Sequence, residues 1–331
     1  YTSMGPGPVG KIAEASQRGA AINIITGMAY GLQSSIIPVM GIIGAIVFSY
    51  VVSGYSLYAM VVANISTDLI IGFIMSSDTF GPIIDNANGI AVMSGLSAEI
   101  GGSLEQLDAV GNTMKASTKG YAMASGTITA FVIFATFFQT AGISQLNVSE
   151  PFDLAVLFIG VGLPFLIASL VIGSTGKTSY LMVDEVRRQF REIDGLLEGK
   201  AEPDYAKCID ISTKNALKEM ILPGLLAILS PMLVGLLFRA EGLGMMLIGA
   251  IASAAFLGPF FSNVGAAFDN AKKMIENGFL GGKGSMAHKA AIVGDTVGDP
   301  FKDVAGPSIL IFMKLLGMSA LLIAPLLVSI R

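Results

Sequence analysis

Four ionisable residues lie close together in the stretch Gly294–Asp303, GDTVGDPFKD, directly before a long apolar run. In a helix, Asp295, Asp299, Lys302 and Asp303 would fall at i, i+4, i+7 and i+8 and share roughly one face. Three carboxylates this close repel one another unless cations lie between them. Carboxylates that leave room for a few waters are the ligands that Mg2+ accepts. The spacing therefore favours a divalent-metal site over a solvated helix start, where acids would merely complement the helix dipole.

The same polar pattern occurs twice along the chain. The motif Asp-Asn-Ala begins at Asp85 near the end of one apolar run and at Asp269 near the end of another. Gly-Asn-Thr begins at Gly111, 26 residues after the first motif, and Gly-Asp-Thr begins at Gly294, 25 residues after the second. Duplicated helix pairs are common among transporters. The repeat predicts that both sets of charges lie at one depth.

Further residues would face this predicted site. Asp85 and Asp269 lie near helix C-termini, where a carboxylate opposes the helix dipole, so we interpret both as cation ligands. Asn112, Lys115 and Lys119 follow at i, i+3 and i+7 on one face of the next helix. Two aligned lysines opposite several acids would form a site for an anion that arrives with metal ions. A purely structural network of salt bridges is the alternative.

Four other charged residues have more than one interpretation. Lys272 lies three residues after an acid and could either pair with it or bind phosphate. Lys314 lies about 16 Å further along the last helix than the acidic stretch. A lysine at that depth in a membrane marks an ion path or gate, although its counter-charge is not evident in the sequence. Asp108 is interpreted as an N-cap, and Asp68 as a lone acid in an apolar span without a visible partner.

The composition indicates which elements hold these residues. Apolar residues make up 53% of the chain and charged residues 13%, whereas soluble domains have about 25% charged residues. The mean hydropathy is +0.71, and the 40 glycines suit close helix packing in lipid. We therefore predict an all-α polytopic membrane protein with about seven transmembrane helices. Apolar runs long enough to span a bilayer lie near 22–52, 56–75, 121–140, 152–172, 220–238, 243–261 and 304–330.

The distribution of basic residues predicts the topology. The connection 173–219 carries eight lysines and arginines, whereas 53–55 and 141–151 carry none. The positive-inside bias then assigns 173–219 to the cytoplasm as a loop between helices. We expect residues 1–331 to form a single integral membrane domain, as part of a larger subunit. All the acidic clusters share this cytoplasmic side. Because the chain begins at Tyr1 without a start Met, we expect it to be part of a longer subunit.

Several other site types are excluded. Gly173–Thr178, GSTGKT, resembles a nucleotide-binding loop, but the required first glycine is Val171 and the segment leaves a helix where it should enter one. His288 is the only histidine and Cys208 the only cysteine, which are too few for a zinc site or a disulfide. We interpret His288 as a surface group at a helix start. No nucleic-acid partner is expected.

With these motifs in hand, the chain resembles the membrane-integral pyrophosphatases, which are ion pumps driven by pyrophosphate hydrolysis. The resemblance implies that the chain is the C-terminal half of a sixteen-helix subunit, with inorganic pyrophosphate as substrate and Mg2+ as cofactor. It also implies a homodimer in contact with membrane lipid. The motifs that carry it are Asp85–Gly89, Asp108–Gly120, Asp269–Lys272, Gly294–Asp303 and Ala305–Pro307.

The resemblance implies a role for each candidate residue. Asp303 would be one of two carboxylates that orient and deprotonate the attacking water. Lys314 would belong to an ion gate below the hydrolytic site. The Mg2+ ligands would be Asp85, Asp269, Asp295 and Asp299 with Asn112 beside them, and the phosphate contacts would be Lys119, Lys272 and Lys302.

One position subdivides the family that the chain resembles. Lys115 stands where K+-requiring members have alanine, and a fixed ammonium there would replace the bound K+. We therefore expect no K+ requirement and proton pumping, with the active site on the cytoplasmic side of a prokaryotic cell membrane.

Three alternatives remain at this stage. The chain could belong to a Na+-pumping pyrophosphatase, to a secondary transporter of a divalent anion, or to a non-catalytic scaffold. The family's other ligand-bearing helices have no counterpart in this sequence, so we expect the chain alone not to hydrolyse pyrophosphate.

Overall fold

A computed structural model describes residues 1–95 and 97–330, and every regular element within these ranges is a helix. The order is α1 (Pro8–Ser16), α2 (Ala20–Ser34), α3 (Ile36–Val52), α4 (Leu57–Asp68), α5 (Ile71–Met93), α6 (Ser97–Ala141), α7 (Pro151–Glu192), α8 (Tyr205–Glu219), α9 (Ile221–Glu276), the short 3-10 helix η1 (Phe279–Gly281), α10 (Met286–Asp299), the π-helix η2 (Pro300–Ala305) and α11 (Gly306–Ser329). The prediction of an all-α polytopic membrane protein is confirmed.

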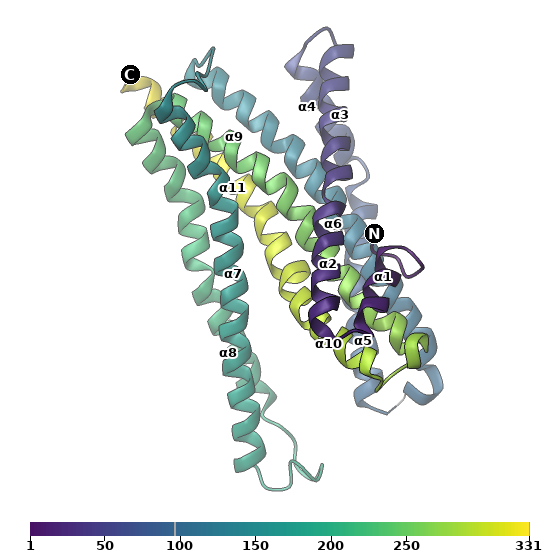
Figure 1. Ribbon diagram of the computed structural model, residues 1–331. Coiled ribbons are helices and arrows are strands. Elements are labelled where there is room, and N and C mark those ends of the chain that lie inside the picture. Colours follow the sequence, from purple (N-terminus) through teal and green to yellow (C-terminus); the bar gives the residue numbers. More distant parts are fainter. Residues whose placement is uncertain (96, 331) are drawn as a thin grey trace.

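The predicted count of about seven spans is not confirmed. Five helices are long and apolar enough to cross a membrane, or six if α4 and α5, bent by 49° at their junction, form one span. The difference lies in α9, which contains both of the expected runs 220–238 and 243–261. At Arg239 its backbone leaves helical geometry (φ 62°, ψ −172°), and the ribbon reverses direction within α9 (Figure 1).

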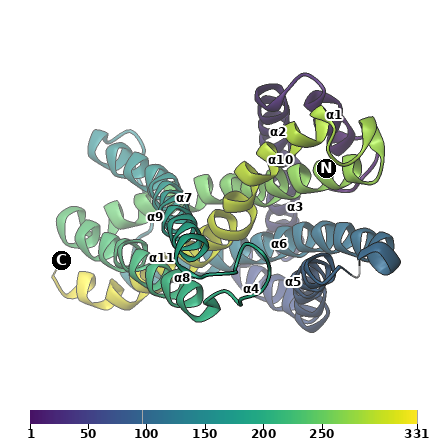
Figure 2. The ribbon, with the colours of Figure 1, turned by 90° about the horizontal axis from the view of Figure 1, so that it is seen from below.

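The second part of α9 and α11 run through the middle of the molecule. α7 packs on one side of them and α6 on the other, and α5 packs against α6 (Figures 1 and 2). α1, α2 and α10 also pack against α9. Buried apolar side chains such as Phe268 and Ile309 fill one core cluster, and Phe137 and Leu243 belong to a second.

Glycines bring the helices of the two predicted repeats into close contact. A Cβ atom on Gly265 would lie 2.5 Å from the carbonyl oxygen of Gly298, so α9 and α10 cross almost backbone to backbone. In the first repeat, a Cβ on Gly111 would lie 3.1 Å from the Cα of Gly81, where α5 crosses α6. Gly81 and Gly265 each lie four residues before the aspartate of Asp-Asn-Ala. Both motifs are therefore held beside a tight crossing.

Most of the segment 173–219 is helical. α7 continues to Glu192, a connection follows, and α8 begins at Tyr205. The Asp204 side chain caps α8 by accepting a hydrogen bond from the backbone N–H of Lys207 (2.9 Å). The end of α7 and α8 form a hairpin that projects beyond the other helices, at the lower end of the molecule in Figure 1.

Candidate functional site

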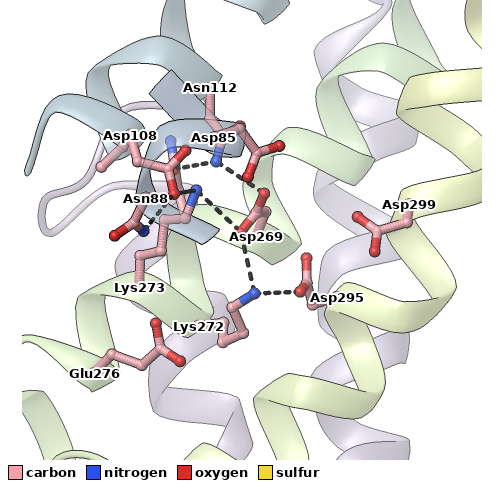
Figure 3. A network of polar contacts seen from close by, with 12 residues as sticks. Asp85, Asn88, Asp108, Asn112, Asp269, Lys272, Lys273, Glu276, Asp295 and Asp299 are labelled. Atoms are coloured by element: carbon pink, nitrogen blue, oxygen red, sulfur yellow. Dashed lines mark hydrogen bonds and ion pairs between the residues drawn. The ribbon is translucent and has the colours of Figure 1, made fainter. Parts of the chain in front are cut away.

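A cavity of about 660 Å³ lies where the C-terminal ends of α5, α9 and α10 meet η2. Most of the acids and lysines singled out in the sequence line this one cavity, although they come from distant parts of the chain. Figure 3 shows Asp269 at the centre of the polar network, with Asp299 approaching from a neighbouring helix. The predicted residues in the wall are Asp85, Asp269, Lys272, Asp295, Asp299, Lys302 and Asp303.

Asp269 is the most strongly bonded of these acids. Its buried carboxylate accepts a hydrogen bond from Lys302 Nζ (2.5 Å) and another from Asn112 Nδ2 (2.8 Å), both on Oδ2. The ammonium groups of Lys272 and Lys273 each lie 3.4 Å from its Oδ1. A buried carboxylate requires such partners because desolvation alone would disfavour its charge. Through Asn112, the first repeat donates a hydrogen bond to the central acid of the second repeat.

Asp295 and Asp299 extend the acidic group along α10. Asp295 is buried and accepts a hydrogen bond from Lys272. The side chain of Asp299 is 51% exposed, and its Oδ1 lies 3.0 Å from Lys302 Nζ. Lys272 and Lys302 therefore each bridge two carboxylates.

The three acids Asp269, Asp295 and Asp299 fit a divalent ion. Each offers a carboxylate oxygen, and these oxygens lie within 4.8 Å of one another. Oδ1 of Asp269 and Oδ1 of Asp295 are buried and accept no hydrogen bond from the residues that the structure describes, although the Lys272 and Lys273 ammonium groups lie 3.4 Å from the former. An unsatisfied buried acceptor is costly, and oxygen ligands of this kind are what Mg2+ requires, with waters completing its shell. The residues present therefore match the predicted metal chemistry.

The π-helix η2 separates the directions of two adjacent residues. Lys302 is buried and points to Asp269, whereas the side chain of Asp303 is 49% exposed and lines the cavity. Lys119 reaches this turn from α6. Its Nζ donates to the backbone oxygen of Lys302 (2.7 Å) and lies 3.6 Å from Asp303 Oδ1. Short π-helical turns are frequent at functional sites.

Lys115 lies in a slot beside the cavity. Its ammonium is 3.4 Å from Asp85 Oδ2, and its side chain is 10% exposed while that of Asp85 is 56% exposed. The aliphatic stem lies against Gly81, where a Cβ would come within 2.4 Å of Lys115 Cγ and Cε. Only glycine at this position leaves room for the lysine stem.

Lys314 lies away from this group. Its side chain is exposed on α11, and within residues 1–95 and 97–330 no salt bridge is formed by it. Asp68 also lies outside the cavity, on α4, where its carboxylate accepts a hydrogen bond from Ser125 (3.3 Å). The structure thus gathers ten of the eleven predicted residues, directly or through one hydrogen bond or ion pair, and leaves Lys314 apart.

Two buried residues that line the cavity, Asp108 and Lys273, were not predicted to belong to the site. Asp108 is not an N-cap, because it lies inside α6. Its Oδ2 pairs with Lys273 Nζ (2.8 Å), with side chains 4% and 8% exposed, and accepts a weaker hydrogen bond from Asn88 (3.3 Å). The signal was the second lysine directly after Lys272, but adjacent helical residues face different ways and the pattern did not show which partner each would find.

His288 is also less exposed than expected. Its Nδ1 accepts the backbone N–H of Gly284 (3.0 Å), and its Nε2 lies 2.9 Å from Glu276, which lines the cavity. At the rim, Lys283 pairs with Glu105 of α6. The hydrogen bond that Lys283 donates to this carboxylate raises the pKa of Lys283 above its usual value. These contacts tie the loop after α9 to both neighbouring helices.

Comparison with known proteins gives a consistent result. A family model described as inorganic H+ pyrophosphatase matches residues 1–323. A protein of Methanosarcina mazei named K(+)-insensitive pyrophosphate-energized proton pump is 44% identical over 99% of this chain and 50% of its own length. A protein of the same name from Caldanaerobacter subterraneus is 43% identical over 98% of this chain and 48% of its own.

A relative with a different name is similarly close. A protein of Clostridium tetani, with the provisional name of a K(+)-stimulated pyrophosphate-energized sodium pump, is 47% identical over 98% of this chain and 49% of its own length. The chain spans about half the length of the curated relatives it matches.

Proposed function

Since the chain belongs to the inorganic H+ pyrophosphatase family, we propose that the complete protein hydrolyses inorganic pyrophosphate with Mg2+ and exports protons, without a K+ requirement. Relatives named as K+-insensitive proton pumps support the proton over Na+. The cytoplasmic placement of the site and a homodimeric state are part of the same proposal and rest on the basic connection 173–219 and on the family resemblance.

One observation carries the proposal. The residues that line one cavity of about 660 Å³ include four acids and two lysines of the predicted metal and phosphate site, and three of these acids bring carboxylate oxygens within 4.8 Å of one another. This arrangement suits a polyanion that arrives with divalent cations, because the cations would offset the repulsion between the carboxylates and the phosphates. A secondary transporter would instead need ionisable groups at mid-membrane depth, reachable from both sides. The acids involved are Asp85, Asp269, Asp295 and Asp299, and the lysines are Lys272 and Lys302.

The residues of this chain would divide the work of binding. Mg2+ held by Asp269, Asp295 and Asp299 would polarise the phosphoryl oxygens and neutralise charge on them. Lys272 and Lys302 now bridge carboxylates, and their ammonium groups can turn to phosphate oxygens as cations take over the acids. Asn112 holds the Oδ2 atom of Asp269 in place through its hydrogen bond.

Asp303 would orient and deprotonate the attacking water. Its half-exposed carboxylate faces the cavity, so it can accept a proton from water beside a bound phosphoryl group. Lys119, 3.6 Å away, would orient this carboxylate and contact the departing phosphate. Phosphoryl transfer depends largely on such positioning and charge stabilisation.

The test is a measurement on the complete protein in sealed vesicles. We expect Mg2+-dependent phosphate release with acidification on the far side in K+-free buffer, and loss of both by about 100-fold or more in Asp303→Asn, since general base catalysis contributes 10²–10⁴-fold. Strong stimulation by K+, Na+ accumulation in place of protons, or full activity of Asp303→Asn would contradict the proposal.

A further inference from the structure

A second, smaller cavity adjoins the charged site. It has a volume of about 250 Å³ and lies between α5, α6 and α11, with one residue of α9 in its wall. Most of the lining is apolar, but four polar side chains also face it: Asp78, Thr118, Lys119 and Ser262. Ionisable groups within membrane-spanning helices often mark ion or proton pathways.

Lys119 connects the two cavities. It lines the smaller one, while its ammonium donates to the backbone oxygen of Lys302 and lies 3.6 Å from Asp303 Oδ1. Asp303 and Lys302 line the larger cavity. The Lys119 side chain therefore lies between Asp303, where a proton would be released, and the smaller cavity.

Asp78 is the carboxylate of this second cavity. Thr118 Oγ1 donates a hydrogen bond to its Oδ1 (2.7 Å), and its other neighbours in the wall include the apolar Ile74 and Met75. Among the residues that the structure describes, no salt bridge involves Asp78. Lys119 from α6 is the charged group that shares its cavity, and the single α9 residue in the wall is the uncharged Ser262.

Ser262 supplies an independent sign of a polar occupant. The residue is 1% exposed, and its hydroxyl oxygen has no hydrogen-bond partner in the described part of the chain. A buried hydroxyl without a partner is destabilising, so it calls for water or a cation. Gly306 leaves the space for it, since a Cβ there would lie 2.7 Å from Ser262 Oγ. The volume is large enough for several waters.

The far wall of the cavity leads toward Lys314. Pro307, Leu310 and Ile311 line the cavity on α11, and Lys314 follows Leu310 by one helical turn on the same side. Gly126 of α6 faces both residues. A Cβ on it would lie 2.3 Å from Leu310 Cδ1 and 3.5 Å from Lys314 Cε. Leu310 thus lies between the polar chamber and the lysine expected at the gate.

We propose that Asp78, with Thr118 and Ser262 around the chamber, is the carboxylate that holds the translocated proton between Asp303 and Lys314. This inference rests on the proposed function. The attacking water gives a proton to the Asp303 carboxylate as its oxygen bonds to one phosphorus, while the bond between that phosphorus and the bridging oxygen breaks and the second phosphate leaves with the bridging oxygen. The proton then passes through water in the chamber to Asp78, which restores the Asp303 anion, and Asp78 becomes an anion again when the proton moves on past Leu310.

The test compares Asp78→Asn and Asp78→Glu in the complete protein, reconstituted in vesicles. Asparagine keeps the shape and the bond to Thr118 but cannot carry the proton. We expect the affinity of Asp78→Asn for Mg2+-pyrophosphate to stay within about threefold of that of the unsubstituted protein. Its rate of proton transport should fall by at least about tenfold, because a proton-transferring side chain is lost. Glutamate should restore part of the transport. Normal transport by Asp78→Asn would overturn the proposal, and so would a parallel loss of pyrophosphate binding, which would indicate structural support of Lys119.

A spectroscopic arm separates proton carriage from packing. During turnover, the infrared difference spectrum should contain a protonated-carboxyl band that is absent in Asp78→Asn and present in the control Asp68→Asn, whose acid lies outside both cavities. A band that persists in Asp78→Asn contradicts the assignment. Failure of the unsubstituted protein to hydrolyse pyrophosphate would instead remove the proposed function itself.

Discussion

Lysine ammonium groups balance the acids of the larger cavity. Lys302 bridges Asp269 and Asp299, and Lys272 bridges Asp269 and Asp295. Breaking a buried pair by removing one partner is strongly destabilising, by about 3–5 kcal/mol. We therefore expect these lysines to stabilise the fold in addition to any role in binding a ligand. The same ammonium groups could serve the acids without metal and the phosphates with it.

Lys115 allows a sharp prediction at the level of one residue. In Lys115→Ala, the slot over Gly81 beside Asp85 loses its fixed cation. We expect phosphate release by the complete protein to fall roughly tenfold in K+-free buffer, the effect of about 1.4 kcal/mol, and to recover as K+ is added. The measurement is the rate of phosphate release against K+ concentration.

The matched control is Lys289→Ala, which removes an exposed lysine of α10 that does not line the cavity. It should remain indifferent to K+. An equal response of both variants to K+ would mean that Lys115 does not stand in for a bound cation.

Residue types and spacing predicted much of the site but not its inner contacts. The repeat of Asp-Asn-Ala predicted that both sets of charges lie at one depth, and Asp85 and Asp269 line one cavity. It could not show that Lys273 turns to Asp108, because helical periodicity does not identify a partner on another helix 165 positions away in the chain (108 to 273). The sequence therefore predicted which residues belong to the network better than which residues contact one another.

At the level of elements, glycine crossings set the spacing of the site helices. Gly265→Ala would place a Cβ 2.5 Å from Gly298 O and 2.6 Å from Lys302 Cβ. Backbone cannot yield as a flexible side chain can, so we expect a loss of about 1–3 kcal/mol in stability and weaker pyrophosphate binding as Lys302 shifts. Thermal unfolding in detergent, with and without Mg2+-pyrophosphate, measures both effects.

Gly173→Ala provides the comparison for this crossing. Gly173 lies in α7, and a Cβ there would meet nothing within 4 Å. The change should be neutral or stabilising by up to about 1 kcal/mol, from helix propensity alone. If both alanine variants unfold at the same temperature, the crossing does not limit the approach of α9 to α10.

The boundaries of the elements were partly predictable. Helices were expected over the apolar runs 121–140 and 243–261, and α6 and α9 extend beyond these runs into polar residues. The π-helix at Pro300–Ala305 was not expected, since a regular helix was assumed through Asp303. A π turn depends on the contacts that hold it, here Lys119 on the Lys302 carbonyl, and such tertiary contacts leave no local pattern.

At the level of the whole molecule, the larger cavity joins helices that are distant in sequence. A divalent ion bound by Asp269, Asp295 and Asp299 would link α9 to α10. Binding to the folded state alone stabilises it, by about 2.7 kcal/mol at 100 times Kd. We expect Mg2+ to raise the unfolding temperature of the complete protein, and chelation to reverse this.

The variant Asp295→Asn should lose most of that Mg2+-dependent rise, whereas Asp68→Asn, outside the cavity, should keep it. A rise of the same size in Asp295→Asn would place the stabilising ion elsewhere. Scanning calorimetry at several Mg2+ concentrations separates the two results.

The projecting hairpin of α7 and α8 offers a marker of sidedness. Its connecting segment, 193–204, contains several exposed polar residues and does not line either cavity. In sealed vesicles whose cytoplasmic face is outward, trypsin should cut near Lys200 and leave the remaining helices intact. Vesicles of the opposite orientation should resist until they are permeabilised, so a single gel would report which compartment receives the spent phosphate.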